Sequence, residues 1–315
     1  MQNPEISVVI PVFNSGSILS ELNRRINNAL VDFSFQIIYV NDCSEDNSLE
    51  FLEKFAKEAK NIIAIDLMKN VGKDNAIIAG LRIVKGNYII IMDDDLQHAP
   101  ENIPDLLIKC KEGFDVCFAS FDKKKHSFIK KAGSKLNGRV ASWLLIKPKG
   151  IYLSPFKIMR AEIAAEICRF TTPFVYINGI ILTITHNICQ IDIPHYKRFS
   201  GKGNYTIYKS VLEIIKLFSG FSIAPLRIAT VFGLIISLIG FGLILLYLYK
   251  YFFSSNYVAG WTTLVVLILF FGGLIVMLLG LIGEYIGRIF LTLSNKPQYL
   301  IKKIINNEND EQPNS

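Results

Sequence analysis

Three consecutive aspartates, Asp93, Asp94 and Asp95, directly follow an apolar run with the composition of a buried strand. Their carboxylates repel one another unless a cation or hydrogen-bond donors neutralise them. If the chain stays extended to position 97, Asp93, Asp95 and Gln97 share one side and Asp94 points to the other. Two carboxylates and an amide oxygen are hard ligands that suit Mg²⁺ or Mn²⁺, completed by water and phosphate. The alternative is a solvated acidic turn that binds nothing.

Other site chemistries have weaker support in the sequence. The histidines show no HExxH or Cys/His spacing, and the five cysteines, without any CxxC pair, indicate free thiols. No GxxxxGK[ST] loop is present, and no GxGxxG follows the first predicted strand, which disfavours a P-loop NTPase or a dinucleotide enzyme. The residues behind these statements are His98, His126, His186 and His195, and Cys43, Cys110, Cys117, Cys168 and Cys189.

A regular alternation of predicted strands and helices positions the aspartates. Helical periodicity with cap signals predicts helices at 18–31, 44–60, 73–86 and 100–113. Short runs rich in β-branched residues predict strands at 6–13, 35–42, 62–67, 88–93 and 115–120. This alternation predicts an α/β fold with a mostly parallel sheet and flanking helices. Ligands bind beyond the carboxyl ends of such strands, where "PVFNSG", "NDCSED" and "MDDDLQ" are expected to meet.

The apolar content of the chain is concentrated towards the C-terminus. The chain has 315 residues, 51% of them hydrophobic, and no charged residue lies within 228–249 or within 251–283. A 22-residue helix is about 33 Å long and matches a hydrocarbon core of about 30 Å. We predict a hairpin of two transmembrane helices, at about 226–250 and 259–283. Two buried core helices are the alternative.

The charges around these spans predict their orientation. The connecting loop carries only Lys250, whereas basic residues flank the outer ends of the two spans, at Arg227, Arg288, Lys296, Lys302 and Lys303. The positive-inside rule then places both ends in the cytoplasm. The N-terminus has no basic n-region or apolar signal core. We therefore expect a multi-pass protein of the inner membrane with a cytoplasmic domain at 1–224, spans within 225–287, and a cytoplasmic segment at 288–315 whose end is disordered.

The net charge of +7 is partly explained by segment 121–150, which holds nine Lys or Arg residues and one acid. An apolar stripe within it predicts an interfacial helix that binds anionic lipid, and 205–221 is a second amphipathic candidate. A solvated basic face is the alternative. No DNA- or RNA-binding module is visible, so we expect no nucleic-acid partner.

Four motifs carry a resemblance to a known family. In order and approximate spacing, "SVVIPVFNSG", "YVNDCSEDNS", "NVGKDNAIIAG" and "IMDDDLQHAPENIP" resemble family-2 glycosyltransferases of GT-A fold. "PLR" before the first span and "GEYIGRI" at the end of the second are similar to polyprenyl-phosphate glycosyltransferases. That group contains bactoprenol glucosyltransferases, the undecaprenyl-phosphate aminoarabinose transferase and dolichol-phosphate mannose synthase. The resemblance covers nearly the whole chain, to about residue 303.

The resemblance implies an inverting transfer of a monosaccharide from a nucleotide sugar, by default a UDP-sugar, to polyprenyl phosphate for cell-surface glycans. It implies that the metal is Mg²⁺ or Mn²⁺, held by Asp93, Asp95 and Gln97. Asp95 and Arg198 are expected to be catalytic, with Arg198 facing phosphate. The expected substrate-binding residues are Pro11, Val12 and Asn14 in the nucleotide pocket, Asp42 at the base or ribose, Lys73 near the donor, and Asp94, Lys202 and Tyr205.

Three positions depart from the family pattern. The family's "DDGS" is Asn41-Asp42-Cys43-Ser44, its "SKY" is Gly203-Asn204-Tyr205, and Ser154 or Pro155 replaces an aspartate proposed as catalytic. A phosphate monoester has its second pKa near ~6, so at neutral pH it is largely a dianion. An ionised nucleophile needs no general base. We therefore expect the lipid phosphate to attack the anomeric carbon directly, in line and with inversion.

Two other functions remain open on the sequence. A family-2 transferase acting on a hydroxyl of a lipid-linked glycan would need a base, and so a further carboxylate in the pocket. A catalytically silent membrane protein that binds a sugar nucleotide is the other alternative. The sequence names neither the sugar nor the base, and it allows a homo-oligomer.

Overall fold

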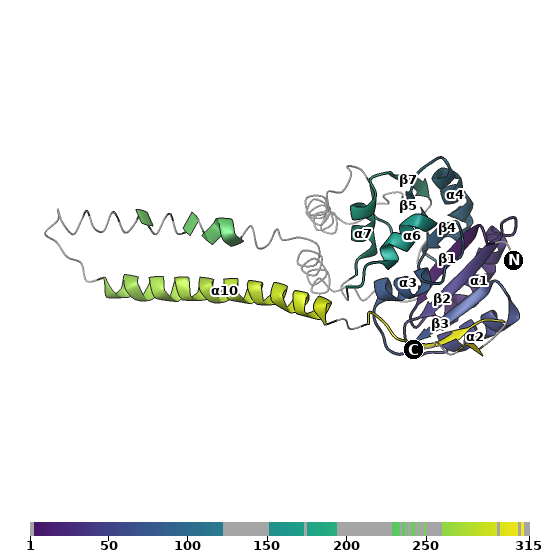
Figure 1. Cartoon of the computed structure of the whole chain (residues 1–315), viewed down its shortest axis with the longest axis horizontal. Helices are drawn as coiled ribbons and strands as arrows, with labels where there is room; N and C mark the ends of the chain where they lie inside the picture. Colours follow the sequence, from purple (N-terminus) through teal and green to yellow (C-terminus); the bar gives the residue numbers. More distant parts are fainter. Residues whose placement is uncertain are drawn as a thin grey trace. The chain divides into compact units, whose positions relative to one another are not determined.

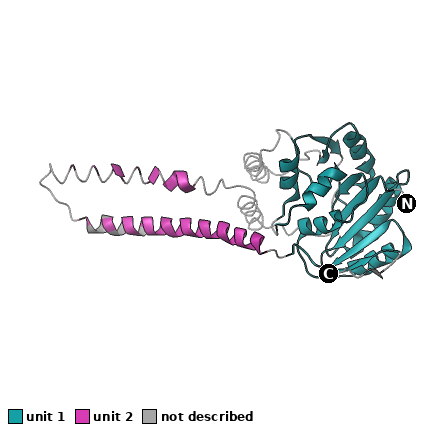
Figure 2. Cartoon of the chain, viewed as in Figure 1, with its two compact units in different colours: residues 1–206, 296–315 teal, residues 207–295 magenta. Residues whose placement is uncertain are grey.

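The computed structural model describes residues 3–121, 151–172, 175–193, 260–294, 297–307 and 310–311, together with scattered positions from 229 to 249 (Figure 1). The chain divides into two compact units, one of residues 1–206 and 296–315 and the other of residues 207–295 (Figure 2). The predicted interfacial helices within 121–150 and 205–221 lie outside the described residues, apart from position 121.

The first unit is built on a sheet that, in the described part of the chain, has nine strands in the order β7-β5-β6-β4-β1-β2-β3-β8-β9. Four neighbours, β4, β1, β2 and β3, are parallel, while β6 and β8 run antiparallel to their neighbours. The strands are β1 (Ile6–Val12), β2 (Phe35–Asn41), β3 (Ile62–Leu67), β4 (Tyr88–Ile91), β5 (Val116–Phe121), β6 (Lys157–Arg160), β7 (Ile188–Ile193), β8 (Ile301–Ile305) and β9 (Asp310–Glu311). The predicted α/β fold with a mostly parallel sheet is confirmed.

Helices cover both faces of this sheet. The apolar face of α1 packs with α2 and α4 in one core cluster with β1 residues such as Val8 and Ile10. On the opposite face, α3 approaches β1 closely, because a Cβ added at Gly80 would lie 2.5 Å from Val9 Cγ1. The helices are α1 (Gly16–Ala29), α2 (Ser48–Glu58), α3 (Lys73–Leu81), η1 (Pro100–Asn102), α4 (Ile103–Lys111), α6 (Ala161–Cys168) and α7 (Ile177–Ile184).

Two local expectations are corrected. Strand β4 ends at Ile91, and residues 94–98 form a bend in which Leu96 has φ of +56°. The segment 93–97 is therefore not extended, and the alternation that placed three oxygens on one side does not apply. The second correction concerns the C-terminal end, where Asp310 and Glu311 form β9 within a tail predicted to be disordered.

The segment that follows the second unit returns to the sheet, which the sequence analysis did not predict. Strand β8 pairs antiparallel with β3, and Met68 N donates to Leu300 O at 2.9 Å. Just before it, Gln298 Nε2 donates to Phe170 O at 3.0 Å and to Thr172 O at 2.8 Å. The sheet of the first unit is thus completed by residues from beyond position 295.

The second unit contains α10 (Trp261–Leu293), of 33 residues. Its part Phe270–Leu293 is long and apolar enough to cross a membrane, and none of that part is buried. The helix overlaps the predicted span 259–283 and continues beyond it. The predicted span 226–250 falls largely outside the described residues, so the two-helix hairpin stays a prediction.

Candidate functional site

The carboxyl ends of β4, β1 and β2 lie side by side, and the loop after each strand contains a strained residue. Among the described residues, Asn14, Cys43 and Leu96 are the three non-glycine residues with positive φ, at 53°, 58° and 56°. Such conformations cost free energy and cluster at functional sites. Three neighbouring loops with this feature make this edge of the sheet the candidate site.

The loop after β1 is tied to the loop after β2. Asn14 N donates to Ser44 Oγ at 3.0 Å, and Asn14 Oδ1 accepts from Glu45 N at 2.8 Å. The predicted pocket residues Pro11 and Val12 are buried within β1. Phe13, which the sequence analysis missed, is 49% exposed and carries an aromatic ring at this edge. The sequence feature that could have identified Phe13 is its position as the first residue after the strand.

Asp42 fixes the loop that precedes α3. It is 3% exposed, and its two carboxylate oxygens accept from Val71 N at 2.7 Å and Gly72 N at 3.0 Å. Burial raises the pKa of Asp42, and the two backbone hydrogen bonds oppose that rise. Gly72 has φ of +85°, a conformation that glycine adopts without strain. The clamp sets where α3 begins, and therefore where Lys73 lies.

The first departure from the family pattern has a structural explanation. Asn41 and Asp66 are register partners on β2 and β3, and Asn41 Nδ2 donates to Asp66 Oδ1 at 2.7 Å. An aspartate at position 41 would face Asp66 as a like charge. The other oxygen of Asp66 lies 3.3 Å from Lys302 Nζ on β8, while Asn41 Oδ1 accepts from Ser44 N. A polar chain thus runs from β8 to the loop after β2.

The three aspartates have three different partners. Asp93 forms an ion pair with Lys73. Asp94 Oδ2 accepts from Phe13 N at 3.2 Å and from Ser15 Oγ at 2.6 Å, and Asp95 Oδ1 accepts from Gln97 N at 3.1 Å. Asp94 therefore binds the loop after β1, and these two hydrogen bonds stabilise part of the negative charge of its carboxylate.

The environments of these carboxyls push their pKa values apart. Burial raises the pKa of Asp94 to about 6, against the hydrogen bonds from Ser15 and Phe13. Burial acts in the same direction on Asp93, but the charges of Lys73, His98 and Lys157 outweigh it and lower the pKa of Asp93. Asp93 is thus held as a carboxylate beside a protonated amine.

The donor set for a divalent ion can be tested against this geometry. Among the described residues, no group of three or more His, Cys, Asp or Glu side chains is arranged to hold a metal ion. The oxygens of Asp93, Asp95 and Gln97 are of the chemical type that Mg²⁺ and Mn²⁺ prefer. Asp93 Oδ1 is buried and lies against the Lys73 ammonium, and no other side chain or backbone group of the described residues donates to it. This oxygen is suited to bind a cation. That Asp93, Asp95 and Gln97 together bind a divalent ion stays a prediction.

A second side of the site, called the second wall below, is formed by the start of β6, which pairs with the end of β4, and by the residues before β6. Ser154 is fully buried, and its Oγ accepts from Phe156 N at 3.1 Å. Lys157 is 3% exposed, and its Nζ donates to Asn178 Oδ1 at 2.8 Å. Burial, followed by the charge of Lys73, lowers the pKa of Lys157 to about 7, against Asp74 and Asp93. Because the hydroxyl of Ser154 is fully buried, it cannot contact a glycosyl acceptor in this conformation.

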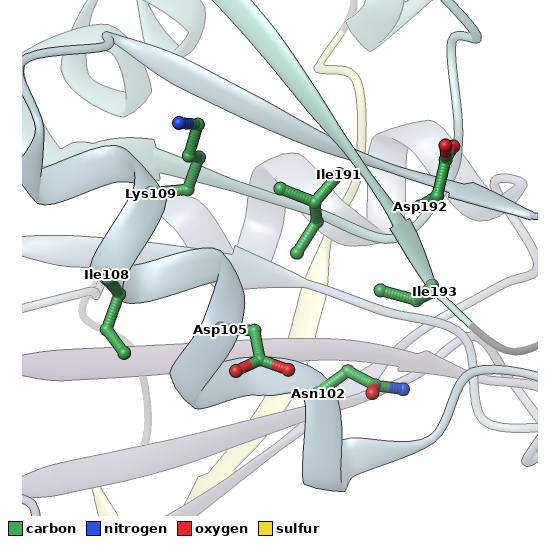
Figure 3. Close-up of a pocket in the computed structure, with 7 residues that line it drawn as sticks. All are labelled: Asn102, Asp105, Ile108, Lys109, Ile191, Asp192 and Ile193. Carbon is green, nitrogen blue, oxygen red and sulfur yellow. The ribbon is translucent and has the colours of Figure 1, made fainter.

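Arg198, Lys202 and Tyr205 lie outside the described residues. A pocket of about 270 Å³ opens elsewhere, between α4 and β7, and contains none of the predicted site residues (Figure 3). It is lined by Asn102, Asp105, Ile108, Lys109, Ile191, Asp192 and Ile193. It has no part in the candidate site.

Comparisons with known proteins identify the family to which the chain is similar. The family described as "Glycosyl transferase family 2" matches residues 7–168, which contain all three strained loops. The chain is 32% identical over 306 residues to the undecaprenyl-phosphate 4-deoxy-4-formamido-L-arabinose transferase of Enterobacter sp. (strain 638), covering 96% of this chain and 94% of that protein. The enzyme of the same description from Photorhabdus laumondii is 32% identical over 318 residues, covering 99% and 98%.

A solved structure shares the fold. The glucosyl-3-phosphoglycerate synthase of Mycobacterium tuberculosis, in complex with Mn²⁺ and UDP-glucose, superposes with a TM-score of 0.53 at 17% identity. The superposition covers 69% of this chain and 77% of that one. At this identity the likeness concerns the fold alone.

Proposed function

The chain belongs to glycosyl transferase family 2, and we propose that it moves a monosaccharide from a nucleotide sugar to polyprenyl phosphate at a membrane. The observation that carries this proposal is the extent of the similarity. Relatives described as undecaprenyl-phosphate transferases match 96% to 99% of the chain, including the apolar second unit as well as the sheet. With a lipid-linked acceptor, the unit that contains the sheet would bind the donor, and the apolar unit would hold the chain in the membrane where the acceptor lies.

The donor would bind at the loops after β1, β2 and β4. Phe13 and Asn14 are exposed there, and Lys73 lies at the N-terminus of α3, where the helix dipole favours negative charge. A divalent ion, when bound by Asp93, Asp95 and Gln97, would neutralise the diphosphate leaving group. Lys73 would contact the same diphosphate. UDP is the first nucleotide to test.

The acceptor phosphate would attack the anomeric carbon directly. The position where relatives carry an aspartate is here the buried Ser154 or its half-buried neighbour Pro155. A phosphate dianion already bears the charge that a base would otherwise create. Rate enhancement would then come from positioning and from charge stabilisation on the leaving group. The rival acceptor, a sugar hydroxyl, needs a general base, which the buried Ser154 cannot supply.

The membrane location follows from the same reasoning. Polyprenyl phosphate keeps its chain in the bilayer, so the phosphate lies at the membrane boundary. Helix α10 provides one segment able to span the bilayer, and the second span, at about 226–250, completes a multi-pass inner-membrane protein in this proposal. The sheet and both termini would then be cytoplasmic.

The proposal is tested with the purified full chain in detergent. Undecaprenyl phosphate, Mn²⁺ or Mg²⁺ and a panel of nucleotide sugars are incubated with it, and mass spectrometry follows glycosyl-phospholipid formation. Undecaprenol, which lacks the phosphate, is the matched control acceptor, and EDTA removes the metal. We expect product with one donor, only with the phosphorylated lipid and only with metal. Glycosylation of a hydroxyl acceptor, with none on the lipid phosphate, would overturn the proposal.

A further inference from the structure

Asp66 is a buried carboxylate near the end of β3 whose two oxygens have different partners. It is 4% exposed, and its Oδ1 accepts from Asn41 Nδ2 at 2.7 Å, while its Oδ2 lies 3.3 Å from Lys302 Nζ. Burying a carboxylate is costly unless donors satisfy its oxygens. Because one donor comes from β2 and the other from β8, the carboxylate is held in one orientation between the two strands.

The Asp66 carboxylate sets the orientation of the Asn41 amide. A carboxylate accepts hydrogen bonds and does not donate them, so the NH₂ group of Asn41 faces Asp66. The amide oxygen then faces the other way, where Asn41 Oδ1 accepts from Ser44 N at 3.2 Å. If the amide were turned over, its NH₂ group would face the Ser44 N–H, and two donors would meet. Asp66 thus decides that the acceptor of Asn41 is turned towards Ser44.

Ser44 connects this arrangement to the loop after β1. Its hydroxyl accepts from Asn14 N at 3.0 Å, and Asn14 Oδ1 accepts from Glu45 N at 2.8 Å. Each of the two loops contains a residue at positive φ, Asn14 at 53° and Cys43 at 58°. Such conformations persist only where the surrounding contacts over-determine them. The hydrogen bond between Asn41 and Ser44 is therefore one of the contacts on which the shape of both loops depends.

We propose that Asp66 is a positioning residue for the nucleotide donor: through Asn41 and Ser44 it holds the loops after β1 and β2 in the conformation that binds a nucleoside diphosphate. This inference rests on the proposed function for the identity of the donor. Asp66 is buried between strands and does not itself contact the donor. A loop that is held in its binding conformation beforehand loses less conformational freedom when the ligand binds, so the affinity is higher.

The test compares four variants of the full chain in detergent. Asp66→Ala removes the acceptor for Asn41, and Asp66→Asn keeps an acceptor oxygen at the same place. Ser44→Ala breaks the hydrogen bond to the loop after β1. Asp115→Ala is the matched control, because Asp115 accepts from Thr185 Oγ1 at 2.6 Å before β5, at the opposite end of the sheet. Binding of UDP, GDP, CDP and dTDP with Mn²⁺ is measured by calorimetry, and thermal unfolding is recorded for each chain.

We expect Asp66→Ala to weaken binding of the preferred nucleoside diphosphate about tenfold, or roughly 1.4 kcal/mol. Asp66→Asn should stay within about threefold of the parent, and Asp115→Ala should lose stability but bind as the parent does. Ser44→Ala should weaken binding as well, and the Asp66→Ala/Ser44→Ala double variant no more than the larger single effect, since both changes break one chain of contacts. Equal binding by Asp66→Ala and the parent, or equal weakening by Asp115→Ala, would overturn the inference.

A second readout does not depend on the nucleotide. Cys43 is exposed in the loop after β2, so its rate of alkylation by a maleimide, followed by peptide mass spectrometry, reports on the freedom of that loop. We expect faster alkylation in Asp66→Ala than in the parent or Asp66→Asn, and an unchanged rate counts against the inference.

Two outcomes need the second readout or the second variant. If no nucleoside diphosphate binds the parent chain, the proposed donor is wrong, and the alkylation rate of Cys43 still decides the role of Asp66. If Asp66→Ala does not fold, Ser44→Ala takes its place in both measurements. Unchanged nucleotide binding and unchanged Cys43 alkylation in Ser44→Ala would then overturn the inference.

Discussion

The two walls of the candidate site use charge in opposite ways. On the wall formed by the loops after β1, β2 and β4, carboxylates accept backbone N–H groups: Asp42 clamps residues 71–72, and Asp94 clamps the loop after β1. On the wall formed by β6 and α7, the central charged group is the buried amine of Lys157. The first wall holds strained loops in place, and the second encloses a lysine whose pKa burial lowers to about 7.

The comparison shows which acidic residues of the first wall hold its loops in place. Asp42 and Asp94 already accept hydrogen bonds that hold loops in place. The number of acidic residues in a motif therefore exceeds the number of carboxylates that can bind a metal ion. Asp93 and Asp95 are the members of the triplet that do not clamp a neighbouring loop through the hydrogen bonds described above. The predictions below separate chemical from structural carboxylates, beginning with the largest expected effect.

Replacing Asp93 or Asp95 by Asn should abolish transfer while leaving the chain folded. Loss of a metal-stabilised leaving group is worth several kcal/mol, or roughly a 10³-fold fall in turnover. Product formation at saturating Mn²⁺ measures the effect. Asp105→Asn, an exposed carboxylate on α4, is the control and should keep full activity. Retention of a tenth or more of the activity by both site variants would refute the predicted metal ligands.

Asn41→Asp should destabilise the first wall, because it places a second carboxylate 2.7 Å from Asp66. Loss of this buried hydrogen bond costs about 2 kcal/mol of unfolding free energy. Adding Asp66→Asn to the same chain should restore most of the loss, since an amide again donates to a carboxylate. Chemical denaturation of the two single variants and the double variant checks this. Strictly additive losses would show that the two side chains are not coupled.

The next prediction concerns how the stability contribution of Asp94 depends on pH. Its folded-state pKa of about 6 exceeds the unfolded value of about 3.9, so the folded chain binds this proton more tightly. Its contribution to stability therefore falls as pH rises from about 4 to 6. Asp94→Asn keeps an acceptor for Phe13 and Ser15 but does not titrate.

With EDTA present, Asp94→Asn should be more stable than the parent by up to about 3 kcal/mol at pH 7.5 and by less than about 1 kcal/mol near pH 4. Thermal unfolding at both pH values measures the difference. Asp94→Ala, which also loses the acceptor, is the companion variant and should not gain stability. A gain of the same size at both pH values would mean that titration of Asp94 is not its source.

The smallest effect is expected on the second wall, at Ser154. Its hydroxyl is buried and bonded to Phe156 N, so Ser154→Ala should change turnover by less than about threefold. A general base would contribute roughly 10²- to 10⁴-fold. Initial rates across pH 6 to 9 compare the variant with the parent. A hundredfold loss, with a changed pH profile, would assign a chemical role to this position.

Local patterns were sufficient to predict the strands and helices up to residue 121. Each of these elements buries an apolar face with its own periodicity, so its signal lies within a few neighbouring residues. The strands β6, β7 and β8 were not predicted. Strand β8 pairs with β3 across more than two hundred residues of chain, a partnership that no local window contains.

The same limit explains what the motifs of the site missed. The triplet of aspartates was found because its residue types are unusual, but the extended conformation assumed for it was wrong, since β4 ends at Ile91. The Asn41–Asp66 pair and the burial of Lys157 depend on which strands become neighbours. A lysine in "SPFKIMR" carries no sign in the sequence that it will be enclosed.

The sequence by itself determined the alternation of apolar strands and helices, the apolar length of the second unit, and the polar motifs at the strand ends, because each depends on residue types at short spacing. Only the tertiary structure decided which aspartates hold the neighbouring loops in place. It also decided that a strand from the far end of the chain supports the loop after β2, and that the side chain of Lys157 is buried. Hydrogen bonds and charge compensation are properties of groups brought together by folding, whatever their separation along the chain.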